Sequence, residues 1–166
     1  MLLFLDAIPY ITIFIFGITI GSFLNVCIYR LPLGESVVTA PSHCMTCGRK
    51  LRWYDMVPVF SWLVLGGKCR NCKSKISVQY PIIEGVNGIL YVVIFAVNGL
   101  VWSSVIYCLM ASALLVLSVI DWRTYEIPFG INVFLFVLGI AMAVLDRGNL
   151  VEHLIGMVCV SGALEV

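Results

Sequence analysis

The residues in this sequence that are best suited to do chemistry are four cysteines in its one polar stretch. They form two Cys-x-x-Cys pairs with twenty-one residues between the pairs: Cys44, Cys47, Cys69 and Cys72. Two tight turns of this kind each direct two thiolates to one point, which suits the tetrahedral coordination of zinc. Because four sulfur ligands leave no open coordination position, the pattern predicts a structural zinc ion and not a catalytic one.

Two alternatives to this ligand set remain open. The cysteine pairs could form disulfides or never meet, and His43 beside Cys44 could replace one of the sulfur ligands. A reducing cytoplasm, where the charge pattern places this segment, favours metal ligands over disulfides. The remaining cysteines lie in apolar runs and are interpreted as small buried hydrophobic residues: Cys27, Cys108 and Cys159.

Asp121 is the second residue with chemical potential, because it directly follows a long apolar run. A carboxylate at a membrane boundary is costly and is a candidate for function. With a second carboxylate nearby, it would form the proton-sharing pair of an aspartyl protease. The alternative is an ordinary boundary residue paired with Arg123. Glu84 and Asn25 are weaker candidates, and for Glu84 we expect a structural ion pair with Arg30.

The composition indicates an integral membrane protein. The 166 residues are 61% hydrophobic and 11% charged, whereas soluble domains are about 25% charged. No charged residue occurs from 7 to 29, which is long enough for one helical crossing. The uncharged run from 85 to 120 is too long for one crossing, so Asn98-Gly99 is predicted to separate two spans.

The elements that must position these residues follow from this pattern. We predict a first transmembrane helix over 1–30, a four-cysteine module over 31–80, and a helical region over 81–166. Within the last region we expect spans at about 82–98, 103–120 and 127–145, and a fifth that starts near Leu150 and is too short to cross. The predicted fold is an all-α membrane protein, a helical bundle with a small zinc-ribbon-like insertion between the first and second spans.

The charge distribution predicts the orientation in the membrane. Eight of the ten Lys and Arg residues lie between Arg30 and Lys75, and only two acidic residues lie in the same segment. The segment therefore has a net charge of about +6, although the whole chain has a net charge of only +1. Basic segments stay on the cytoplasmic side. We therefore predict a cytoplasmic module and an N-terminus outside. Membrane lipid is an expected partner, and nucleic acid is not.

Several motifs resemble, in their order, those of the bacterial type IV prepilin peptidases. The opening motifs are Gly21-Ser-Phe-Leu-Asn-Val26 and Tyr29-Arg-Leu-Pro32. Leu51-Arg-Trp-Tyr-Asp55 follows the first cysteine pair, and Tyr80-Pro-Ile-Ile-Glu84 follows the second. Ile120-Asp-Trp-Arg-Thr-Tyr-Glu-Ile-Pro128 resembles the segment with the first catalytic aspartate of that family.

The resemblance implies an aspartyl protease at the cytoplasmic face of the bacterial inner membrane. It would remove the basic leader from prepilins or pseudopilins, with Asp121 as its first catalytic acid. Many members of the family then methylate the new N-terminal amine with S-adenosylmethionine. The competing hypothesis is a membrane-anchored zinc-ribbon module that binds a cytosolic partner and has no active site.

One departure from the family pattern concerns the second catalytic acid. The family carries it in a Gly-x-Gly-Asp motif, which this sequence lacks. Asp146 is expected on the opposite membrane face, and Glu126 lacks the motif. We therefore predict that the chain alone is inactive. We also predict that it self-associates, because polar helix faces that would pack on further helices are otherwise exposed to lipid. The final Leu164-Glu-Val166 reads like an engineered linker, so a shortened form is expected, with a naturally short protein as the alternative.

Overall fold

The computed structural model describes residues 2–38, 42–146 and 148. Its long helices are α1 (Leu2–Arg30), α3 (Gln79–Asn98), α4 (Trp102–Thr124) and α5 (Phe129–Leu145). Within these residues the chain has no strand, only two isolated β-bridges, which confirms the all-α prediction. The fifth span expected near Leu150, Cys159 and the Leu164–Val166 end lie outside the described residues.

Three of these helices are long and apolar enough to cross a membrane: Ala7–Arg30 of α1, Gln79–Asn98 and Trp102–Thr124. The helix α5 is also apolar but has 17 residues. The predicted break at Asn98-Gly99 is present, because Gly99 adopts a φ of 79° and its N–H donates to the carbonyl of Phe95 at 2.9 Å. Glycine adopts a positive φ without strain, so Gly99 can end the helix at this position.

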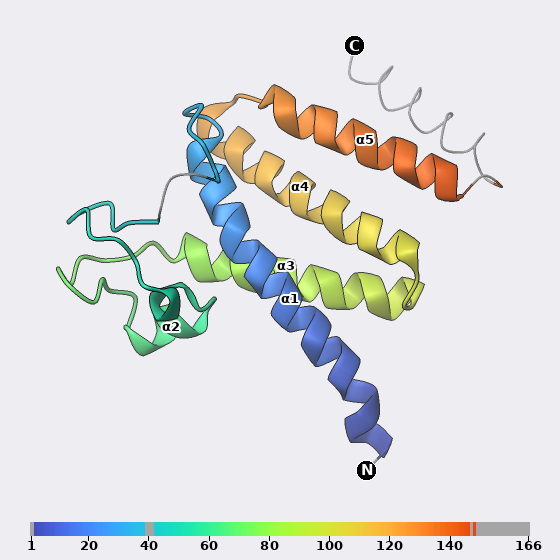
Figure 1. The fold of residues 1–166 in the computed structure, drawn as a ribbon, viewed down its shortest axis with the longest axis horizontal. Helices are drawn as coiled ribbons and strands as arrows, with labels where there is room; N and C mark the ends of the chain where they lie inside the picture. Colours follow the sequence, from blue (N-terminus) through green and yellow to red (C-terminus); the bar gives the residue numbers. More distant parts are fainter. Residues whose placement is uncertain (1, 39–41, 147, 149–166) are drawn as a thin grey trace.

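The helices α1 and α3 cross in direct backbone contact (Figure 1). A Cβ atom on Gly17 would lie 2.7 Å from the Cα of Gly88, and one on Gly21 would lie 2.7 Å from the Cα of Glu84. The buried Asn87 side chain donates to the carbonyl of Gly17 at 2.8 Å. Small residues four apart and a buried amide are typical of helix pairs in membranes. This crossing brings the C-terminal end of α1 beside the N-terminal end of α3.

We expect Gly21→Ala to weaken this crossing by about 1–3 kcal/mol, because backbone atoms cannot rotate away from the added methyl group. Gly139→Ala is the matched control, since among the described residues no atom outside its own helix backbone and chain neighbours lies within 4 Å of a Cβ atom at that position of α5. The measurement is unfolding of each variant in detergent, followed by circular dichroism. Equal stability of the two variants would contradict the close α1–α3 contact.

The helix α4 packs on both members of this pair, and α5 packs on α4 (Figure 1). The core cluster lies towards the end of the bundle where α4 ends and α5 begins, and its buried residues are Leu24, Ile28, Ile83, Ala113, Val116, Ile120 and Ile131. Between α3 and α4, the Ser112 hydroxyl donates to Asn87 Oδ1 at 2.9 Å and lies 3.0 Å from the Tyr91 hydroxyl. These contacts fix α4 and thereby the position of its last turn.

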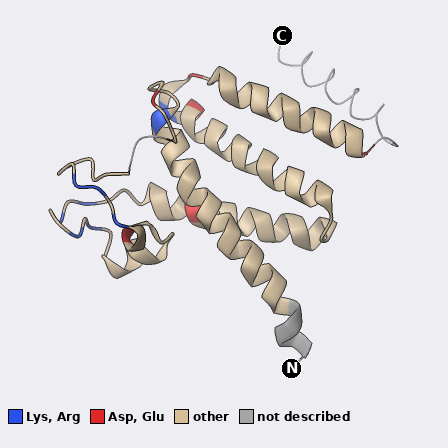
Figure 2. Cartoon of the chain, viewed as in Figure 1, with Lys and Arg blue, Asp and Glu red and all other residues tan. Residues whose placement is uncertain are grey.

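Between α1 and α3 the chain forms a small, mostly irregular domain, as predicted. Its regular pieces are a 3-10 helix, η1 (Trp53–Met56), and the five-residue helix α2 (Phe60–Val64). Seven of the ten Lys and Arg residues of the sequence lie in this domain (Figure 2). We call it the cysteine module.

Candidate functional site

The four predicted cysteines come together in the module. Their sulfur atoms all lie within 4.8 Å of one another, and Cys44 Sγ lies 3.8 Å from Cys72 Sγ. None of the four forms a disulfide. Sulfur atoms at this spacing surround a point from which a tetrahedral zinc ion could bind all of them. The donor set therefore fits zinc.

The two cysteine turns repeat the same backbone arrangement. The N–H of Gly48 donates to the carbonyl of Cys44 at 2.9 Å, and the N–H of Lys73 donates to the carbonyl of Cys69 at 3.0 Å. Gly48 and Lys73 both adopt a positive φ, of 67° and 57°. Glycine adopts this conformation without strain, whereas a lysine there is uncommon. The shared turn geometry directs each pair of thiols inward.

The turn geometry also favours the thiolate form of two ligands. The backbone N–H groups of Cys47 and Thr46 lower the pKa of the Cys44 thiol to about 6. The hydroxyl and the backbone N–H of Ser74 lower the pKa of the Cys72 thiol. The thiolate is the form of cysteine that binds metal, so the lowered pKa of these two thiols favours metal binding.

A cavity of about 730 Å³ lies between the module and the helices α1 and α3. Among the residues that line it are Asn25 and Glu84, which are only 1% and 6% exposed. The Asn25 amide donates to the carbonyl of Tyr80 at 3.2 Å, but its Oδ1 atom is buried without a hydrogen-bond partner among the described residues. Buried acceptors without a donor are costly. The wall of the cavity thus offers a carboxylate and an amide oxygen to a ligand.

The structure corrects the predicted ion pair between Glu84 and Arg30. Glu84 Oε2 instead accepts a hydrogen bond of 2.6 Å from the backbone N–H of Val59, and Arg30 donates to the carbonyl of Ser36 at 3.1 Å. Val59 precedes α2 and has a φ of 60°, which is rare for a β-branched residue. The carboxylate of Glu84 therefore fastens the module to α3.

Asp121 lies in the last turn of α4, where its carbonyl accepts the N–H of Tyr125 at 2.9 Å. Its neighbour Ile120 is 1% exposed in the core, whereas Asp121 itself is exposed. The Arg123 guanidinium lies 4.5 Å from the centre of the Tyr29 ring, so Arg123 contacts α1 and is not held by Asp121. Within the described residues, the Asp121 carboxylate makes no ion pair.

The ends of three helices are tied together by side chains near the last turn of α4. The Tyr29 ring stacks on the Tyr80 ring with centroids 5.6 Å apart, and Arg123 covers the Tyr29 ring. Sequence reasoning missed this arrangement, although the three residues lie in the resembling motifs. Asp121 does not line the 730 Å³ cavity. The catalytic candidate and the cysteine cluster are thus separate sites on the same end of the bundle.

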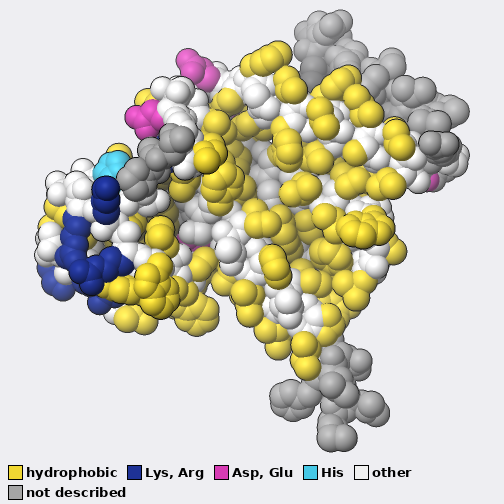
Figure 3. Space-filling model, in the orientation of Figure 1, with side chains coloured by type: hydrophobic (Ala, Val, Ile, Leu, Met, Phe, Trp, Pro, Cys, Tyr) yellow, Lys and Arg dark blue, Asp and Glu magenta, His cyan; other side chains and the backbone are white. Residues whose placement is uncertain are grey.

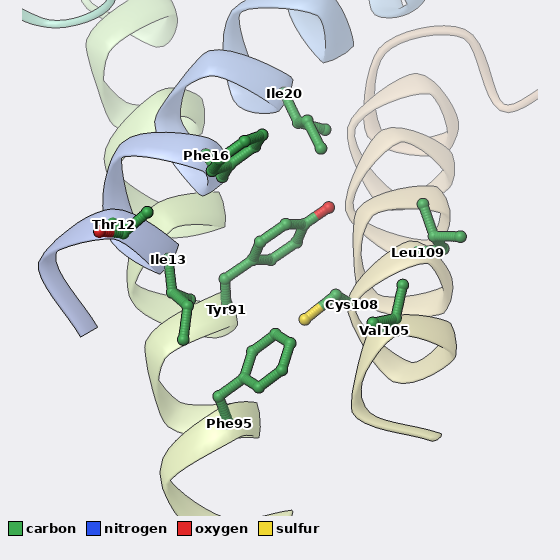
Figure 4. A pocket seen from close by; sticks show the side chains of 9 residues that line it. All are labelled: Thr12, Ile13, Phe16, Ile20, Tyr91, Phe95, Val105, Cys108 and Leu109. Carbon is green, nitrogen blue, oxygen red and sulfur yellow. The ribbon is translucent and has the colours of Figure 1, made fainter. Parts of the chain in front are cut away.

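A second hollow of about 370 Å³ lies within the spans, between α1, α3 and α4. Figure 4 shows the aromatic rings of Phe16, Tyr91 and Phe95 around it, with Cys108 facing them from α4. Its lining is mainly apolar, and the lining residues with a hydroxyl or thiol group are Thr12, Tyr91 and Cys108.

Sequence comparisons give two family matches in tandem. The profile of the bacterial peptidase A24 N-terminal domain matches residues 15–98, and that of the type IV leader peptidase family matches residues 108–166. The first match covers the C-terminal half of α1, the module and α3, and the second covers most of α4 and all of α5. No solved structure is significantly similar to the chain.

Curated relatives agree with these matches. A prepilin leader peptidase/N-methyltransferase of Myxococcus xanthus is 38% identical over 131 residues, which cover 79% of this chain and 39% of that protein. A type 4 prepilin-like proteins leader peptide-processing enzyme of Escherichia coli is 35% identical, over 68% of this chain and 48% of that protein. A prepilin leader peptidase/N-methyltransferase of Xanthomonas campestris is 33% identical, over 75% of this chain and 51% of that protein.

The chain thus spans about half the length, or less, of these relatives. Two adjacent profiles nevertheless cover the four-cysteine module and the helix that carries Asp121. The chain belongs to the bacterial type IV leader peptidase family, the A24 peptidases.

Proposed function

We propose that this chain contributes to a membrane aspartyl endopeptidase that removes the leader from type IV prepilins or pseudopilins. The observation that carries the proposal is the exposed Asp121 at the end of a membrane-spanning helix, inside the segment that the leader peptidase profile matches. A carboxylate at that boundary can contact both water and a peptide bond that lies next to a hydrophobic substrate helix. The membrane-anchored binding module without an active site remains the alternative.

In the proposed reaction, Asp121 acts with a second carboxylate that shares one proton with it. The ionised carboxylate takes a proton from water, and the water oxygen attacks the carbonyl carbon of the scissile bond. The protonated partner donates to the carbonyl oxygen, and the leaving amine then takes up a proton. Both carboxylates need to lie at the same membrane face.

We place that face in the cytoplasm. Seven basic side chains of the module are exposed on one side of the bundle: Arg49, Lys50, Arg52, Lys68, Arg70, Lys73 and Lys75. The positive-inside rule assigns this side to the cytoplasm and the start of α1 to the outside. In a bacterium the membrane is then the inner membrane.

Zinc is proposed as the resident metal of the module. Cys44, Cys47, Cys69 and Cys72 are its ligands, and the ion holds the two cysteine turns together. With all four positions filled by sulfur, the ion takes no part in peptide hydrolysis. Its role is to give the module, which has little regular structure, a fixed shape above the cavity.

S-adenosylmethionine is proposed as a second ligand, because two of the relatives described above are named N-methyltransferases. The 730 Å³ cavity is within the usual range for small-molecule sites. Glu84 and the unpartnered Oδ1 of Asn25 present negative or partly negative atoms, which suit a cationic ligand. When bound, the donor supplies a methyl group, and these two residues hold and orient it.

The proposal is tested with protein expressed from its complete reading frame, a purified prepilin and S-adenosylmethionine, followed by mass spectrometry of the pilin. We expect loss of the leader and addition of one methyl group. Glu84→Gln should leave cleavage intact and weaken donor binding, measured by calorimetric titration, about tenfold, because one charge-assisted interaction is lost. Glu126→Gln is the matched control. An uncleaved prepilin would contradict the peptidase assignment, and unchanged titration would contradict the cavity assignment.

A further inference from the structure

The short helix α2 has two different faces. Trp62 points inward, where its ring N–H donates to the carbonyl of Ile76 at 3.3 Å. The outer face carries Phe60, Leu63 and Val64, which are 62%, 59% and 81% exposed, and Trp53 of η1 is 77% exposed. Residues three and four apart lie on one side of a helix, so Phe60, Leu63 and Val64 form a single apolar face of α2. Figure 3 shows an apolar patch on the module beside its basic side chains.

The position of α2 relative to the spans follows from one hydrogen bond. The N–H of Val59, the residue before α2, donates to Glu84 Oε2 at 2.6 Å. Glu84 is the sixth residue of the spanning helix α3, so it lies about 7.5 Å along the axis from the start of that helix. Interfacial helices bury their apolar face about 5–10 Å into the boundary between headgroups and acyl chains. The hydrogen bond therefore places the start of α2 beside the first two turns of the spanning helix α3, near the end of that span.

The charges around this face match a membrane surface with anionic lipid. Seven exposed Lys and Arg residues lie on the same module, beside the apolar patch (Figure 3), and of the two acidic residues in the basic segment, Asp55 already pairs with Arg70 at 2.8 Å. Basic side chains next to an apolar helix face are attracted to the negative headgroups of the cytoplasmic leaflet. Trp53 suits the same position, because tryptophan is enriched at membrane interfaces.

We propose that the outer face of α2, together with Trp53, inserts into the lipid interface beside α3 and that the basic residues of the module bind anionic headgroups. The module is then held by three attachments: α1, α3 and the lipid itself. This monotopic anchor keeps the 730 Å³ cavity at the membrane surface. The proposal depends on the membrane-spanning fold and not on the peptidase activity, so the two can fail independently.

The test places the photo-crosslinking residue p-benzoylphenylalanine at Phe60 or Val64 in the purified protein. Met45 is the matched control position, because it is a large apolar residue of the same module and is 80% exposed, but it lies between the cysteines and not on α2. Each protein is reconstituted in nanodiscs with or without anionic phosphatidylglycerol and irradiated. Mass spectrometry then measures the fraction of chains with a lipid adduct, and zinc content checks that the module is intact.

We expect about fivefold more lipid adduct at Phe60 and Val64 than at Met45. With Lys68→Gln, Lys73→Gln and Lys75→Gln combined, the adduct at Val64 should fall about threefold in anionic nanodiscs and stay constant in neutral ones. Equal adducts at all three positions would overturn the proposal. So would adducts at Phe60 that form mainly with an added prepilin or with a second copy of the chain, since the face would then be a protein-docking surface.

Discussion

Asp121→Asn is expected to lower prepilin cleavage by about 10²–10⁴-fold, the usual contribution of a general acid or base. Asparagine keeps the shape of the side chain and removes only its charge and its proton exchange. The residue is exposed at the end of α4, and its neighbour Ile120 stays in the core, so the fold should not change. The measurement is the initial rate of leader removal by protein expressed from its complete reading frame.

The control for this prediction is Asp146→Asn. Asp146 follows the last residue of α5, whereas Asp121 lies in the last turn of α4, so the whole length of α5 separates the two residues along the chain. Its variant should cleave within about twofold of the unaltered protein, because no proton transfer at the reacting bond depends on it. If Asp121→Asn cleaves as fast as this control, Asp121 is not a catalytic residue.

Cys44→Ser is expected to reduce zinc from about one ion per chain to nearly none, since a structural four-sulfur site relies on all its thiolates. The module should then lose the arrangement of its two cysteine turns, while α1, α3, α4 and α5 keep their helical structure. Elemental analysis gives the metal content. Hydrogen exchange of the Gly48 and Lys73 amides, which are hydrogen-bonded in the two turns, reports on the module.

Cys27→Ser is the control that shows whether zinc is lost because a ligand is removed or because any cysteine is removed. Cys27 lies in α1 and is not a member of the sulfur cluster, so its variant should keep the zinc. Protein purified under reducing conditions without chelators must contain zinc before either variant is informative. Finding none in the unaltered protein would refute the metal site.

The helices and the cysteine cluster were predictable because their determinants are local. Long uncharged runs specify membrane helices, and Gly99 ends one of them with a conformation that glycine adopts easily. The paired spacing of Cys44 and Cys47 brings two sulfurs together within one turn, whatever the rest of the chain does. Local rules also located Asp121 at the end of α4.

The contacts that dock the module were not predictable, because they join distant segments through backbone groups. Glu84 accepts a hydrogen bond from the main-chain N–H of Val59. Nearly every residue of the chain has a main-chain N–H, so the sequence does not show which one is the donor. The Asn25 amide likewise reaches the carbonyl of Tyr80. The type of a residue does not indicate whether its main-chain N–H or carbonyl group forms such a hydrogen bond. Reasoning from charge alone therefore assigned Glu84 to Arg30, the nearest cation in depth.

The glycine contact between α1 and α3 has a consequence for how the protein can vary. Asn25 and Tyr29 of α1 contact Tyr80 of α3, so the crossing alone holds the two ends of the module close together. The entropy of closing a loop rises only with the logarithm of its length. Residues can therefore be added or removed between the cysteine turns at little cost to the spans. The helices hold the two ends of the module in place, so the module can change in length over evolution while the helices stay the same.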